Sequence, residues 1–163
     1  MKYQIIILKY SEMLYYIMSN EVFVPREHHM SRIRESRGSD FIKVLTGIRR
    51  CGKSTLMRMF IDELGQSGVT EDRILFMNLD DEGSGIETFR DLIDIAESKL
   101  GDVRDSFIFL DEVQNVPEWE RAVSTFYTRE ADVYIGNIGV TIGNIEWLGL
   151  PFLYSYYNLK KFQ

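Results

Sequence analysis

One stretch of this chain has the residue types and the spacing of a phosphate-binding loop. Residues 47–54 read GIRRCGKS, so a glycine and four further residues are followed by Gly-Lys-Ser. Glycines let the backbone turn tightly and approach an anion, and successive N–H groups can then face phosphate oxygens. In this pattern the lysine reaches the β- and γ-phosphates and the serine hydroxyl helps to hold Mg²⁺, so we expect Lys53 to act in catalysis and Ser54 to be a metal ligand. The expected nucleotide-binding residues are Gly47, Ile48, Arg49, Arg50, Cys51, Gly52, Lys53, Ser54 and Thr55.

A second candidate part of the site is a pair of carboxylates that follows an apolar run. Residues 107–110 read FIFL and lead directly into Asp111 and Glu112. Such a run predicts a buried strand, and ligands of open α/β sheets bind at the carboxyl ends of the strands. We expect Asp111 to hold Mg²⁺ through a water molecule and Glu112 to act as the general base on the water that attacks the γ-phosphate.

The loop has the flanking elements that this chemistry requires. Residues 41–46 form a short run rich in apolar and β-branched side chains, which predicts a buried strand before the loop. After the loop, apolar residues recur at helical spacing until Gly65, where we expect the helix to stop. These apolar residues are Leu56, Met57, Phe60, Ile61 and Leu64.

Further strands and helices alternate along the chain. Residues 73–79 and 132–135 predict two more strands, and Asp80 after the first of them is a minor candidate for a role near Mg²⁺. Three strand–helix units followed by a strand predict a parallel sheet with right-handed crossovers. Together with the glycine loop, this order predicts an α/β fold of the three-layer P-loop NTPase type, with helices on both faces of the sheet and an incomplete C-terminal end.

Two helix starts are predicted from local signals. Ser84 and Glu87 have the spacing of a capping box, and Gly101 is expected to end that helix. Pro117 fits the first position of the next helix. The apolar stripes expected on these two helices are Ile86, Phe89, Ile93, Ala96 and Leu100, and then Trp119, Val123 and Phe126.

Composition narrows the class of protein. The chain has 163 residues, of which 45% are hydrophobic and 27% charged, as expected of one globular domain. Its net charge of −6 argues against a dedicated nucleic-acid binder. A single cysteine excludes an internal disulfide, and the apolar N-terminal run is interrupted by Lys9 and Glu12, so it predicts neither a membrane span nor a signal peptide. We expect a cytoplasmic protein.

Both ends of the chain are less regular than its middle. Residues 1–23 are rich in aromatic and aliphatic side chains, which fits either a helix packed on the core or an extension outside the domain. Residues 25–38 carry four arginines and two glutamates, which fits a solvated helix or linker, or a basic arm that touches a neighbouring subunit or nucleic acid. Residues 136–163 have no clear plan of helices or strands. The expected division is an N-terminal extension (1–23), a P-loop ATPase core (24–135) and an atypical tail (136–163).

The sequence segments around both motifs resemble those of a known family. The segments LTGIRRCGKS (45–54), NLD (78–80) and FLDEVQNVPEWE (109–120) are similar to those of prokaryotic AAA-type P-loop ATPases, in which the AAA domain is normally followed by a C-terminal domain of unknown function. The resemblance covers about residues 24–135 and implies an ATP-binding domain with Mg²⁺.

The end of the chain departs from that family. There, the fourth strand runs into a Thr-Gly-Ser-Asn-like segment whose polar residue senses the γ-phosphate, and Asn137 is the nearest substitute in this chain. The final strand, helical lid and arginine finger have no recognisable counterpart. The chain therefore looks truncated, with an end such as an altered reading frame would produce.

Three functions remain open. The first is an Mg²⁺-dependent ATP-binding domain with weak or impaired hydrolysis, because an arginine finger supplies a rate factor of roughly 10³–10⁵. The second is a non-hydrolysing P-loop remnant that acts as a binding module. The third, less favoured, is a small-molecule kinase. The expected partner is a nucleotide, self-association is the one protein contact we consider, and no clear nucleic-acid or membrane signal is present.

Overall fold

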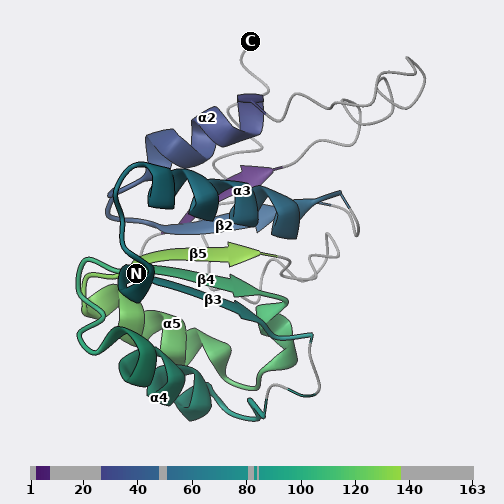
Figure 1. Cartoon of the computed structure of the whole chain (residues 1–163). Coiled ribbons are helices and arrows are strands. Elements are labelled where there is room, and N and C mark those ends of the chain that lie inside the picture. The colour runs from purple at the N-terminus through teal and green to yellow at the C-terminus, as the bar shows by residue number, and fades with distance from the viewer. Residues whose placement is uncertain (1–2, 8–26, 48–50, 81–82, 84, 137–163) are drawn as a thin grey trace.

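The computed structural model describes residues 3–7, 27–47, 51–80, 83 and 85–136. Within these residues, five strands form one parallel sheet in the order β1-β2-β5-β4-β3 (Figure 1). The strands are β1 Tyr3–Ile7, β2 Ile42–Thr46, β3 Ile74–Asn78, β4 Phe107–Asp111 and β5 Asp132–Gly136. The α-helices are α2 Glu27–Ser36, α3 Lys53–Gln66, α4 Phe89–Leu100 and α5 Trp119–Thr128, with short 3₁₀ turns η1 Glu71–Arg73 and η3 Val113–Asn115.

The sheet is the middle of three layers. Helices α2 and α3 cover one face and α4 and α5 cover the other, as Figure 1 shows. Alternate strand residues therefore enter two cores: Ile108 and Leu110 pack under α4 and α5, whereas Phe109 packs under α2 and α3. A strand that is buried on both faces needs a continuous apolar run, which is what the sequence of β4 provides. The predicted α/β class and the layered parallel sheet are confirmed.

Helix α3 carries the expected apolar stripe but ends later than predicted. Leu56, Met57, Phe60 and Leu64 are buried. Gly65 lies inside the last turn, and the helix ends at Gln66, where the Ser67 N–H donates to the carbonyls of Glu63 and Leu64. Gly65 does not have a positive φ, so its backbone conformation does not end the helix there.

Helix α4 begins at a different capping box from the predicted one. The cap is Thr88, whose side chain accepts from the Asp91 N–H at 3.4 Å, while the Asp91 carboxylate accepts from the Thr88 N–H at 2.7 Å. The prediction of Ser84 and Glu87 was wrong: the Glu87 N–H instead donates to Asp91, and Ser84 lies outside the described residues. Two candidate boxes follow each other in the sequence, and the helix uses the second, which is nearer its buried residues.

The other helix boundaries also separate correct from incorrect predictions. Gly101 ends α4 with a φ of 67°, as expected of a glycine at that position. Pro117 is not the first residue of the next helix, because α5 begins two residues later at Trp119. In α5, the stripe of Trp119, Val123 and Phe126 is buried as predicted. In α4, Leu92 is fully buried although the predicted stripe did not include it.

The N-terminal segments join the sheet layer and one helix layer. Residues 3–7, for which we considered a helix or an outside extension, form strand β1, which pairs in parallel with β2. Helix α2 buries Met30 and Ile33, and its Arg34 forms ion pairs with Glu27 and with Glu63 of α3. The hydrogen bonds from Arg34 hold the pKa of Glu63 below its usual value. One of the four arginines is thus committed to packing α2 on α3.

Candidate functional site

The predicted loop connects the end of β2 to the start of α3. Strand β2 ends at Thr46 and α3 begins at Lys53, so the loop lies at the carboxyl edge of the sheet. Gly52, at the N-cap of α3, has a φ of 89°, a conformation that residues with a side chain rarely adopt. The glycine before the lysine is therefore required by the backbone, as the motif predicts. Residues 48–50, and with them the predicted contacts of Ile48, Arg49 and Arg50, lie outside the described residues.

Lys53 contacts residues at both ends of the described part of the loop. Its side chain is buried, and its Nζ donates to the Gly47 carbonyl at 3.0 Å and lies 3.6 Å from Cys51 Sγ. The two ends of the motif are thus held together by the residue expected to contact phosphate. Ser54 and Thr55 follow in the first turn of α3, which contains no acidic residue. The N–H groups and the dipole at the start of a helix favour an anion.

Asp111 lies close to this loop in the sheet. It ends β4, and β5 separates it from β2: Leu45 pairs with Gly136, which in turn pairs with Asp111. Two strand spacings correspond to about 10 Å between the backbones. The Asp111 side chain is 2% exposed, and its Oδ1 has no hydrogen-bond partner among the described residues. A buried carboxylate oxygen without a donor is costly unless a cation or water satisfies it.

This donor set fits Mg²⁺ bound together with a nucleotide. No group of three or more His, Cys, Asp or Glu residues in the described part of the chain could hold a metal by itself. Mg²⁺ commonly takes one or two protein oxygens, with phosphates and waters as the other ligands. Asp111 and the Ser54 hydroxyl are oxygens of this kind, so the residues present are compatible with the ion.

Gly136 is a site residue that our sequence reasoning missed. A Cβ at this position would lie 2.8 Å from Asp111 Oδ1 and 2.9 Å from Met57 Sδ. Both distances are far shorter than normal contacts, so any side chain would displace the carboxylate or the methionine. The signal in the sequence was a glycine at the end of the fourth strand, which we had assigned to the tail.

Glu112 follows Asp111 in an uncommon backbone conformation. Its φ is 55°, in the left-handed region, and its carboxylate Oε2 accepts a hydrogen bond of 2.6 Å from Gln114 Nε2. Asp80, the minor candidate, is exposed, and its Oδ1 lies 3.4 Å from Asn115 Nδ2. Asn137, the possible phosphate sensor, lies outside the described residues. Sequence reasoning did not single out Gln114 or Asn115.

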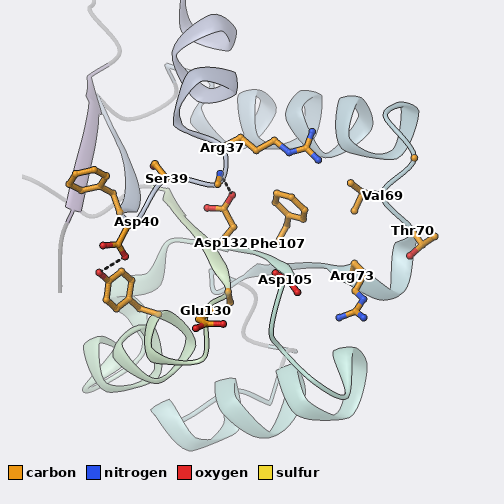
Figure 2. A pocket seen from close by; sticks show the side chains of 15 residues that line it. Arg37, Ser39, Asp40, Val69, Thr70, Arg73, Asp105, Phe107, Glu130 and Asp132 are labelled. Carbon is orange, nitrogen blue, oxygen red and sulfur yellow. Dashed lines mark hydrogen bonds between the residues drawn. The ribbon is translucent and has the colours of Figure 1, made fainter.

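A separate hollow of about 660 Å³ lies at the opposite, amino edge of the sheet. Figure 2 shows Arg37 near Phe107 on one side and Asp40 bonded to Tyr127 on the other. Two more of its acidic side chains have partners, since Asp132 accepts from the Gly38 N–H and Glu130 pairs with Arg104. None of the predicted site residues lines it. The motif end of the sheet is therefore the better candidate.

Comparison with known proteins agrees with this geometry. A family model described as an AAA domain matches residues 39–139, well over half of the chain. The chain therefore belongs to this family of AAA-type, P-loop ATPase-like proteins. The matched range includes the loop, Asp111, Glu112 and Gly136, but not β1 or α2.

Individual relatives give less information. The chain is 30% identical over 107 residues to an uncharacterized protein of Haemophilus influenzae. That match covers 64% of this chain and 27% of the relative, so the chain spans about a quarter of the relative's length. No solved structure matches. In the described part of the chain, no helix is long and apolar enough to cross a membrane.

Proposed function

We propose that this chain is an ATP-binding domain of AAA type that binds ATP together with Mg²⁺ and hydrolyses it weakly. The observation that carries the proposal is the buried Asp111 carboxylate, whose Oδ1 lacks a partner two strands away from a glycine loop and its lysine. The Asp111 oxygen is costly to bury without a cation or water, and Lys53 brings a positive charge to the loop. Together they provide positive charge for phosphates and a free oxygen for a hydrated cation.

Lys53, the start of α3 and Glu112 would have different roles in hydrolysis. Lys53 Nζ, now on the Gly47 carbonyl, would turn to the β- and γ-phosphates, and the N–H groups at the start of α3 would hold the other oxygens. Bound Mg²⁺ would withdraw negative charge from the phosphates. Glu112 would take a proton from a water molecule while the oxygen of that water forms a bond to the γ-phosphorus. The bond from that phosphorus to the bridging oxygen breaks, which leaves ADP and phosphate.

The weak rate is the part of the proposal that comes from the sequence. No arginine finger, phosphate sensor or lid can be assigned, and an arginine finger alone contributes roughly 10³–10⁵ in rate. A non-hydrolysing P-loop module is the second candidate, because the same absence could reduce turnover to nothing. A kinase is less favoured, since Glu112 directly after Asp111 is suited to activating water.

Calorimetry and phosphate release on the full chain test this proposal. We expect ATP to bind more tightly with Mg²⁺ than without it, and Lys53→Ala to weaken binding at least ~10-fold, since the lysine contacts two phosphates. A matched control is Lys99→Ala, which removes an exposed lysine in the last turn of α4.

The outcomes separate the candidate functions. Phosphate release that is lost in Lys53→Ala but kept in Lys99→Ala would support a working ATPase. Binding without release would favour the non-hydrolysing module. No binding by the unaltered chain would contradict the proposal.

A further inference from the structure

The turn that carries Glu112 is held in place at both ends. On one side, Val113 is fully buried in the core under α4 and α5. On the other, Asn115 Nδ2 donates to the Leu79 carbonyl at 3.1 Å, and the Asn115 N–H donates to the Glu112 carbonyl at 3.1 Å. These contacts support the left-handed φ of Glu112, a conformation that costs free energy and persists only where the surroundings hold it.

The same turn brings the side chain of Gln114 into hydrogen-bond contact with Glu112. Gln114 is exposed, and its Nε2 donates to Glu112 Oε2 at 2.6 Å. Within the described part of the chain, Gln114 makes no other hydrogen bond, and its aliphatic part is not in either core cluster. The contact with Glu112 is therefore the interaction that the structure gives this side chain.

We propose that Gln114 is a positioning residue for the attacking water. Its amide holds Oε2 of Glu112, which leaves Oε1 as the acceptor for that water. This role rests on the proposed function, because it acts on the same general base. It adds a residue that neither the motif nor the family match assigns.

The physical reason is the freedom of a glutamate side chain. The side chain of a partly exposed glutamate has three rotatable bonds. It acts less efficiently as a general base when its carboxylate samples many positions. A general base must lie within hydrogen-bond reach of the proton that it takes. One hydrogen bond from a fixed turn restricts the carboxylate without blocking its second oxygen.

Single-turnover hydrolysis by the full chain, with enzyme in excess over ATP, tests the role. Gln114→Leu keeps the size of the side chain but removes the donor, so we expect the rate of phosphate release to fall ~10-fold while the affinity for MgATP changes less than ~2-fold. Gln66→Leu, at the exposed end of α3, is the matched control and should change neither value. In a Glu112→Gln background, Gln114→Leu should cause no further loss.

A second measurement reports the contact without any turnover. In the ¹⁵N-labelled chain, the side-chain amide signals of Gln114 should shift in Glu112→Gln and stay in place in Glu118→Gln, whose side chain pairs with Arg121. Unchanged Gln114 signals in Glu112→Gln would show that the contact is absent and would overturn the proposal.

The kinetic outcomes distinguish this proposal from the proposed function. Equal rates for Gln114→Leu and Gln66→Leu, or a loss of affinity without a loss of rate, would overturn the role of Gln114 alone. A chain that binds MgATP but releases no phosphate in a single turnover would overturn both this role and hydrolysis. A chain that does not bind ATP would contradict the proposed function itself.

Discussion

At the scale of single residues, the contact between Lys53 and its own loop is the most informative. The ammonium lies 3.0 Å from the Gly47 carbonyl and 3.6 Å from Cys51 Sγ. A ligand that draws Lys53 onto its phosphates would therefore alter the surroundings of the thiol. Cys51 is the only cysteine in the chain and is partly exposed, so its reactivity can be followed without interference.

We predict that MgATP slows the alkylation of Cys51. Phosphates in the loop would cover the thiol, and we expect a fall of at least ~5-fold in the rate of reaction with iodoacetamide, since thiol reactivity depends on access. Mass spectrometry of the labelled chain over time measures the rate. In Lys53→Ala the same concentration of nucleotide should give less protection, and equal rates with and without MgATP in the unaltered chain would count against the site.

At the scale of elements, the ends of β4 and β5 fit together through the absence of a side chain. Gly136 faces Asp111 in the register of the two strands, and Met57 of α3 closes the same space. The position of the carboxylate thus depends on a strand that contributes no chemical group. This arrangement also joins α3, which carries Lys53, to the strand beside Asp111.

We predict that Gly136→Ala selectively weakens the Mg²⁺-dependent part of nucleotide binding. The added methyl group would force the Asp111 carboxylate or Met57 aside, so the gain in affinity on adding Mg²⁺ should fall ~10-fold, a difference of ~1.4 kcal/mol. Titration calorimetry of ATP with and without Mg²⁺ measures that gain.

Gly65→Ala is the matched control for this substitution. Nothing lies within 4 Å of a Cβ at Gly65, and alanine favours a helix. If Gly136→Ala kept the full effect of Mg²⁺, the proposed role of this glycine would be wrong. A thermal melt of both variants would show whether folding is affected.

At the scale of the whole molecule, a buried ion pair joins distant parts of the chain at the amino edge of the sheet. Lys43 of β2 is fully buried and pairs with Asp132 of β5, which also accepts hydrogen bonds from the Gly38 N–H and the Tyr134 hydroxyl. Burial and the neighbouring carboxylate raise the pKa of Tyr134 well above its usual value, so its hydroxyl stays a donor. In Figure 2, the dashed line at Asp132 marks its bond from the Gly38 N–H.

We predict that Asp132→Asn destabilises the fold by ~3–5 kcal/mol, because it leaves the buried Lys43 charge without its partner. Urea unfolding measures the change in the free energy of unfolding. The control is Glu97→Gln, which breaks the exposed pair with Arg129 and should cost less than ~1 kcal/mol. Similar costs for the two variants would show that Lys43 is solvated or compensated.

The sequence predicted the type of each element well where the cause lies within a few residues, although the local signals at Gly65 and Pro117 misplaced two helix ends. The tight turn expected at the loop glycines, the apolar run of β4 and the stripe of α5 each follow from local geometry, and the structure agrees with all three through the positive φ of Gly52 and the buried residues of β4 and α5. The α4 start was missed although it is also local, because two candidate capping boxes follow each other in the sequence and the helix begins at the second. The roles of Asp111, Glu112 and Lys53, and the division into 1–23, 24–135 and 136–163, stay predictions.

What the sequence determined by itself is therefore the α/β class, the loop, and the strand that delivers two carboxylates. The tertiary structure decided which residues meet: β1 pairs with β2 across 39 positions (Tyr3 with Ile42, 42 − 3), Gly136 makes room for Asp111, and Asn115 ties the Glu112 turn to Leu79. Hydrophobic periodicity and backbone preferences act between near neighbours in the chain, so they appear in a single sequence. Strand order and close approach arise from contacts between segments far apart, and only the folded chain brings these together.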